Sequence, residues 1–216
     1  MSEFHSISRI HSAASDSRLL VLLHGYGSHE NDLPGLADEL EGQVNYISLR
    51  APLSLPWGGY AWFPIYPAAN GFTSDVQAAR LVIQDLHQWM LQTLAQYQPA
   101  DGKLWLLGFS QGSILSQALM MRFPELVGGV MGLSGYLNQE MLEDLSGQPS
   151  AVNCALFLAH GTEDGVIPIH KARETHLFYQ SLGMAHEYHE YAMGHSVSGE
   201  EMLDLQNWWK DHRPTI

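Results

Sequence analysis

The chain has 216 residues, of which 45% are hydrophobic, and this is enough to fill the core of one domain. We therefore expect residues 1–216 to form a single domain. Lysine and arginine total 10 against 23 aspartates and glutamates, so the formal net charge is −13 at pH 7. A chain this acidic repels phosphate backbones and anionic bilayers, which argues against nucleic acid as a partner.

The first apolar run, residues 19–23, is only five residues long, and no basic segment typical of a secretory signal precedes it. No stretch approaches the roughly 18 apolar residues that a membrane-spanning helix needs. Cys154 is the only cysteine, so an internal disulfide cannot form. These features favour a cytoplasmic protein that does not insert into membranes.

Short apolar runs rich in Val, Leu and Ile recur along the chain and alternate with helical segments. Continuous apolar strands of this kind predict a buried parallel sheet. We expect strands over residues 18–25, 44–50, 103–109, 127–135, 154–161 and 186–193.

The clearest helix lies between residues 76 and 97, where apolar residues recur every three or four positions and so share one face. We expect Thr73 or Ser74 to cap its N-terminus, with Asp75 complementing the positive end of the helix dipole. Further helices are expected over residues 111–122, 170–182 and 198–211.

Strands that alternate with helices imply an α/β fold, with one mostly parallel sheet flanked by helices and right-handed crossovers. Ligands of such sheets bind at the carboxyl ends of the strands, so the chemistry is expected there. Residues 50–72 form a long segment rich in proline, glycine and aromatic residues. Its apolar residues follow neither the 3.6-residue period of a helix nor the two-residue period of a strand. Such loops are usually functional or disordered.

A candidate nucleophile lies in Gly108-Phe109-Ser110-Gln111-Gly112, which matches G-x-S-x-G directly after an apolar strand and directly before a helix. The bare pattern is weak, and the strand-turn-helix context is what gives it meaning. A side chain at position 108 or 112 would collide with the backbone around Ser110, whose hydroxyl must project above the sheet.

A serine hydroxyl needs a base with a pKa near 7 and a carboxylate that holds this base in the right tautomer. Asp164 follows one predicted strand and His195 follows the next, so both are expected on the same sheet edge as Ser110. The chain order Ser, Asp, His is that of α/β-hydrolases.

Other residues offer alternatives to this assignment. Glu163 is a neighbouring carboxylate that could replace Asp164, because adjacent side chains point in different directions. His186 and His189 lie within a predicted strand, where an exposed or packed role is the default. His195 follows a glycine in a loop and is better placed.

The oxyanion of a tetrahedral intermediate needs two backbone N–H donors, which we assign to Tyr26 and Gln111. Tyr26 follows the first strong strand and has a glycine on each side, so unusual backbone angles are open to it. Gln111 follows the nucleophile, and its N–H lies at a helix start. His24 and His160 are expected to hold their loops through local hydrogen bonds.

With these residues assigned, the chain resembles the phospholipase/carboxylesterase family, which includes acyl-protein thioesterases and small bacterial carboxylesterases. The resemblance spans nearly the whole chain and implies an α/β-hydrolase fold with Ser110, Asp164 and His195 as the triad. Two segments depart from the family: HGYGS stands where many members read HGLGD, and WFP where many read WFD or WYD. The pieces that carry the resemblance are LLHGYGSHENDL, LRAP, AWFPI, LLGFSQGS, GLSGYL, HGTEDGVIPI and MGHSVSGEE.

Aromatic residues of the 50–72 segment are candidates for an acyl-binding wall, although each could instead anchor the segment to the sheet. We expect Trp208 and Trp209 mainly to pack, with one of them exposed at a homodimer interface. The substrate-binding candidates are Trp57, Tyr60, Trp62 and Phe63.

The sequence therefore predicts a serine carboxylesterase or thioesterase that acts on small esters or thioesters, with acylated proteins as further candidate substrates. No compact metal-ligand spacing appears, so no metal or other cofactor is expected. The interval between Gly135 and Cys154 is too short for a cap domain, and an open site would favour short to medium acyl chains. The alternative is a non-catalytic binding protein, because this fold also serves as a receptor.

Overall fold

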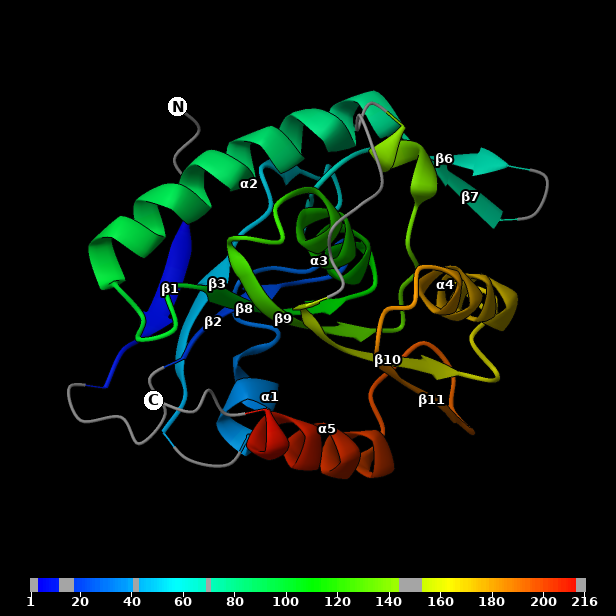
Figure 1. Ribbon diagram of the computed structural model, residues 1–216. Helices are drawn as coiled ribbons and strands as arrows, with labels where there is room; N and C mark the ends of the chain where they lie inside the picture. The colour runs from blue at the N-terminus through cyan, green and yellow to red at the C-terminus, as the bar shows by residue number, and fades with distance from the viewer. Residues whose placement is uncertain (1–3, 12–17, 41–42, 69–70, 144–152, 213–216) are drawn as a thin grey trace.

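The computed structural model describes residues 4–11, 18–40, 43–68, 71–143 and 153–212. Among these residues a seven-stranded sheet has the order β1-β3-β2-β8-β9-β10-β11 (Figure 1). The predicted, mostly parallel α/β-hydrolase sheet is confirmed, and each predicted strand is present. The parallel strands are β2 (Leu19–Leu23), β3 (Asn45–Leu49), β8 (Leu104–Phe109), β9 (Val127–Leu133), β10 (Ala155–Gly161) and β11 (Glu187–Tyr191).

Helices cover both faces of the sheet, which explains why its strands are apolar throughout rather than alternating. In β2, residues 19, 21 and 23 face one core and residues 20 and 22 face the other. One face is covered by α2 (Val76–Tyr97), α3 (Gln111–Arg122) and α4 (Ile169–Ser181), and the other by α1 (Pro34–Glu39) and α5 (Gly199–Asp211) (Figure 1).

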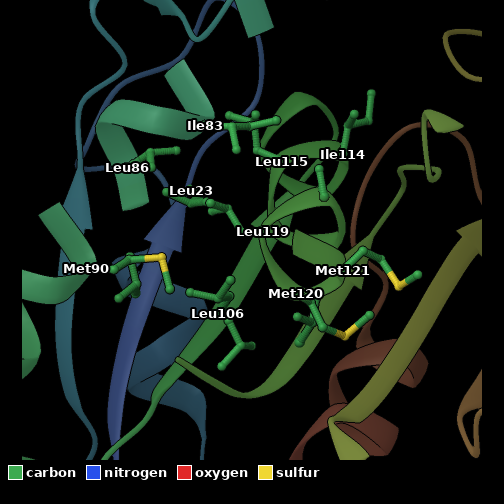
Figure 2. Close-up of a cluster of buried hydrophobic side chains, with 14 of the residues drawn as sticks. Leu23, Ile83, Leu86, Met90, Leu106, Ile114, Leu115, Leu119, Met120 and Met121 are labelled. Atoms are coloured by element: carbon green, nitrogen blue, oxygen red, sulfur yellow. The ribbon is translucent and has the colours of Figure 1, made fainter. Parts of the chain in front are cut away.

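Helix α3 is enclosed between the sheet and α2, and residues 111–121 of it are all buried. Figure 2 shows Ile83 and Leu86 of α2 directed toward Leu115 and Leu119 of α3, with Leu23 of β2 beneath them. This packing fixes the N-terminal end of α3 relative to the ends of β2 and β8.

The N-cap of α2 differs from the expectation. Asp75 has an extended backbone, and its side chain accepts a hydrogen bond from the Ala78 N–H at 3.0 Å. Thr73 and Ser74 belong instead to a short strand, so neither is the capping residue.

The 50–72 segment, together with the two residues that follow it, forms two short antiparallel ribbons rather than one irregular loop. The first pairs β4 (Leu53–Ser54) with β5 (Tyr60–Ala61), and the second pairs β6 (Ile65–Ala68) with β7 (Gly71–Ser74). Strands this short give too few residues for a visible alternation. The β6–β7 ribbon stands off the body of the domain, on the side of α4 (Figure 1).

Three further elements were missed by the sequence patterns. Edge strand β1 (Ser6–Arg9) pairs antiparallel with β3 and is mostly exposed, so it has no apolar run to reveal it. Helix α1 has only six residues. The 3-10 turn η1 (Gln139–Leu142) follows β9. Residues 144–152 lie outside the described residues, so the absence of a cap domain and the single-domain organisation of 1–216 stay predictions there.

Trp208 and Trp209 are only 2% and 0% exposed, and both rings lie edge-on to Trp105 of β8. The expectation that one of them is exposed at a dimer interface is therefore wrong, because α5 turns both into the core. No helix in the described part of the chain is long and apolar enough to span a membrane.

Candidate active site

Ser110 lies in a sharp turn between β8 and α3. Its backbone has φ 54° and ψ −116°, a conformation that non-glycine residues rarely adopt, and its N–H donates to the Leu133 carbonyl at 2.9 Å. A Cβ on Gly108 would lie 2.4 Å from the Gly112 carbonyl oxygen, and one on Gly112 would lie 1.8 Å from the Leu23 carbonyl oxygen. The predicted collision with the backbone around Ser110 is confirmed for Gly108, whereas the backbone that excludes a side chain at Gly112 is that of Leu23 and His24.

Three polar side chains from separate strand ends form a continuous chain of hydrogen bonds. Nε2 of His195 lies 2.9 Å from Oγ of Ser110, and Nδ1 of His195 lies 2.7 Å from Oδ2 of Asp164. Because the carboxylate can only accept, Nδ1 carries the proton and Nε2 is left to accept the serine hydroxyl hydrogen. This arrangement can draw a proton from Ser110.

Asp164 is held by both of its oxygens. Oδ1 accepts from the backbone N–H groups of Val166 and Ile167 at 2.8 and 2.9 Å, and Oδ2 lies 3.3 Å from Nε2 of His160. His160 also donates to the Ile167 carbonyl at 2.7 Å, so it holds this loop as expected. The alternative carboxylate, Glu163, is exposed to solvent.

The two competing histidines, His186 just before β11 and His189 within it, have other partners. Nε2 of His186 lies 2.8 Å from Nδ1 of His176, and the ring of His189 stacks on Phe157 with the centroids 5.1 Å apart. Of these candidates, His195 is the one that contacts Ser110.

Tyr26 and Gln111, the two residues expected to supply oxyanion donors, line the same cavity as Ser110. Tyr26 follows β2, and Gln111 is the first residue of α3. Within the described residues, neither N–H donates a hydrogen bond to another part of the chain. Both donors are thus free to bind an oxygen atom placed next to Ser110.

The cavity beside Ser110 has a volume of about 1030 Å³ and mostly apolar walls. Trp57 and Phe63 line it, as expected. Tyr60 and Trp62 do not: Tyr60 lies under the guanidinium of Arg50 at 4.6 Å, and Trp62 is 0% exposed within the core. Phe63 is itself 0% exposed and packs in the same core cluster as Trp62, so it can contribute to the cavity wall only from within the core.

Sequence patterns missed the rest of the cavity wall. Val166 and Ile167 come from the segment that follows Asp164, and Ile65 and Phe72 come from the β6–β7 ribbon. The sequence did hold a signal for these wall residues. Val166 and Ile167 are apolar residues that come soon after the expected catalytic Asp164, and Ile65 and Phe72 are apolar residues of the aromatic-rich segment.

A partly buried ion pair between Glu30 and Arg50 stabilises the loop that follows β2. Glu30 is 3% exposed and accepts from Nε of Arg50 at 2.7 Å. This hydrogen bond lowers the pKa of Glu30 to about 2. Because the Arg50 guanidinium also stacks over Tyr60, the pair joins the Tyr26 loop, β3 and the 50–72 segment.

The fold and the Ser110 site together define a serine hydrolase of the α/β-hydrolase class. The carboxylesterase of Bacillus cereus has the same fold, with a TM-score of 0.83 over 97% of this chain and 94% of that chain at 18% identity.

Sequence relatives narrow this class. A probable carboxylesterase of rice (Oryza sativa subsp. japonica) is 29% identical over 76% of this chain and 63% of the rice protein. Acyl-protein thioesterase 1 of the yeast Debaryomyces hansenii is 29% identical over 89% of this chain and 90% of its own. The sequence profile described as Phospholipase/Carboxylesterase matches residues 5–213, and the chain belongs to this family.

Proposed function

We propose that this protein hydrolyses carboxylic esters and thioesters with short to medium acyl groups, through an acyl-enzyme on Ser110. The substrate is a small molecule or an acyl group carried by a protein. The observation that carries the proposal is the hydrogen-bonded chain of Ser110, His195 and Asp164 at an apolar cavity.

In the proposed reaction, Nε2 of His195 removes the proton of Ser110 as Oγ attacks the acyl carbon. The displaced electron pair moves to the carbonyl oxygen, which accepts from the N–H groups of Tyr26 and Gln111. The imidazolium, stabilised by Asp164, then protonates the leaving alcohol or thiol. Water activated by the same imidazole attacks the acyl-enzyme and releases the acid.

The walls of the cavity support an apolar acyl group. Trp57, Phe72 and Val166 are 72%, 60% and 53% exposed, so the cavity opens to water. An open apolar site accepts dissolved esters without a lipid surface, and it gains little from the distal part of a long chain that remains in water.

A fluorophosphonate probe tests this proposal against the binding-protein alternative. The enzyme reacts one-to-one with the probe, the Ser110→Ala variant does not react, and the Ser181→Ala variant, altered at an exposed position at the end of α4, reacts like the parent protein. A folded parent protein that stays unlabelled, yet binds fatty acyl ligands, would support the alternative. Hydrolysis of ester and thioester series of increasing chain length then defines the acyl preference.

We also propose a cytoplasmic location and no nucleic-acid partner. The net charge of −13 opposes association with phosphate backbones, and the single cysteine, which cannot form an internal disulfide, agrees with a reducing compartment.

A further inference from the structure

Residues 60–63, which we call the strap, run beside the loop that carries the first proposed oxyanion donor. Tyr60 pairs with this loop through two backbone hydrogen bonds of 2.8 Å, from its N–H to the Ser28 carbonyl and from the Gly27 N–H to its carbonyl. Gly59 comes so close that a Cβ there would lie 1.9 Å from the Gly27 carbonyl oxygen. The strap and the residue after Tyr26 therefore pack backbone against backbone.

The strap also holds the loop on the other side of Tyr26. The indole N–H of Trp62 donates to the His24 carbonyl at 2.8 Å, and the two rings lie 5.5 Å apart. His24 is itself fixed, because Nδ1 lies 2.7 Å from the Gly25 carbonyl and Nε2 accepts from the Ala51 N–H at 3.1 Å. Its burial lowers the pKa of His24, which agrees with a neutral imidazole in these two bonds.

The second proposed donor reaches the same strap with its side chain. Oε1 of Gln111 accepts from the Trp62 N–H at 2.8 Å, and Nε2 of Gln111 donates to the Phe63 carbonyl at 2.8 Å. Gln111 is 4% exposed, and Trp62 and Phe63 are 0% exposed, so water does not compete for these bonds. Gln111, whose backbone N–H is a proposed oxyanion donor, is thus hydrogen-bonded to the strap through its side-chain carboxamide.

We propose that Trp62 and the side chain of Gln111 are positioning residues that set the separation and direction of the Tyr26 and Gln111 N–H groups. This inference rests on the proposed function. Neither side chain reaches the reacting atoms, and each acts through the strap. Phe63, one of the residues that line the cavity, belongs to the same strap, so the cavity wall and the proposed oxyanion hole share one segment.

The kinetic consequence differs from that of a general packing defect. Oxyanion donors bind the negative oxygen of the tetrahedral state more strongly than the ground-state carbonyl. A displaced donor therefore lowers kcat and weakens tetrahedral adducts, while KM changes little. Removal of one whole donor lowers kcat by about 10² to 10³-fold, so loosening a donor should lower it by less.

Trp62→Phe is the first test, because it keeps an aromatic ring in the core and removes the indole N–H. Trp209→Phe is the matched control: Trp209 is 0% exposed, lies in the core on the opposite sheet face, and its Nε1 has no hydrogen-bond partner within the described residues. We expect Trp62→Phe to lower kcat for p-nitrophenyl butyrate by about 10 to 100-fold. The inhibition constant of an alkyl trifluoromethyl ketone should rise by the same factor, with KM nearly unchanged and Trp209→Phe unaffected.

Gln111→Leu and Gln111→Glu give a second test, in which the backbone N–H remains. Gln111→Leu removes both bonds to the strap, and Gln111→Glu replaces the donor to the Phe63 carbonyl with a second acceptor, so both variants should lower kcat and inhibitor affinity with KM nearly unchanged. Folded Trp62→Phe and Gln111→Leu variants that bind the ketone as the parent does would overturn the positioning role. If Trp62→Phe does not fold, the affinity of the two Gln111 variants for the ketone tests the positioning role by itself.

The parent protein separates this failure from failure of the proposed function. A folded parent that is neither labelled by a fluorophosphonate nor inhibited by the ketone contradicts the hydrolase mechanism itself. A labelled and inhibited parent whose variants match it contradicts only the positioning role.

Discussion

The α-carbon of Gly112 packs so closely against β2 that a Cβ atom would lie 1.8 Å from the Leu23 carbonyl oxygen. The backbones of α3 and β2 cannot move apart to make room, because α3 is enclosed by the sheet and α2. We expect Gly112→Ala to lower the free energy of unfolding by more than about 3 kcal/mol, measured by urea unfolding. Gly35→Ala, in α1 with nothing within 4 Å of its Cβ, should leave stability unchanged or raise it by up to about 1 kcal/mol. A Gly112→Ala protein as stable as its parent would contradict this packing.

The hydrogen-bonded chain from Ser110 through His195 predicts strongly non-additive losses of activity. Ser110→Ala and His195→Ala should each lower kcat for p-nitrophenyl esters by about 10⁴ to 10⁶-fold, and the double variant should be scarcely worse. His189→Ala, which removes an imidazole that stacks on Phe157, is the control and should keep most of the activity. Multiplicative losses in the double variant would show that the two residues do not act as one unit.

Trp57 is the most exposed of the predicted aromatic wall residues, at 72%, and it lines the cavity. Trp57→Ala should shift relative kcat/KM along a series of p-nitrophenyl esters by about 1 to 3 kcal/mol, because apolar contact with the acyl chain is lost. Leu53→Ala, altered on β4 and outside the cavity lining, should leave the profile in place. If both variants keep the parental profile, Trp57 does not contact the acyl chain.

Glu201 is 0% exposed near the start of α5, and burial raises its pKa from 4.5 to about 8. As the pH rises from about 4.5 to 8, the carboxyl ionises in the unfolded chain before it ionises in the folded protein, so stability falls across this window. Glu201→Gln should therefore be more stable than the parent at pH 8, by on the order of 1–3 kcal/mol, with a smaller difference at pH 5.

Urea unfolding of both proteins at these two pH values measures this difference. Glu200→Gln removes an exposed carboxylate from the same helical turn and should show no such pH-dependent gain. A Glu201→Gln variant whose stability follows that of the parent at both pH values would mean that Glu201 is ionised in the folded protein.

The regular elements were predictable because their signals are local. The predicted bounds of α3 are those of the structure, and each of the six predicted strands is present within two residues at either end. The site residues Ser110, Asp164 and His195 were also predictable, since each follows a parallel strand and the carboxyl ends of such strands share one edge. Short elements such as α1 and the β4–β5 ribbon have too few residues to show a period.

The sequence by itself determined the type of each long element, the steric need for glycine at 108 and 112, and the chain order of the candidate triad. Only the tertiary structure decided that Trp62 lies in the core and outside the cavity lining. That choice depends on Gln111, 49 positions away from Trp62, and on the His24 carbonyl, 38 positions away. Likewise, the partly buried Glu30–Arg50 pair joins residues 20 positions apart. Periodicity reflects contacts within a few residues, whereas side-chain direction in an irregular segment is set by whichever distant buried groups need hydrogen-bond partners.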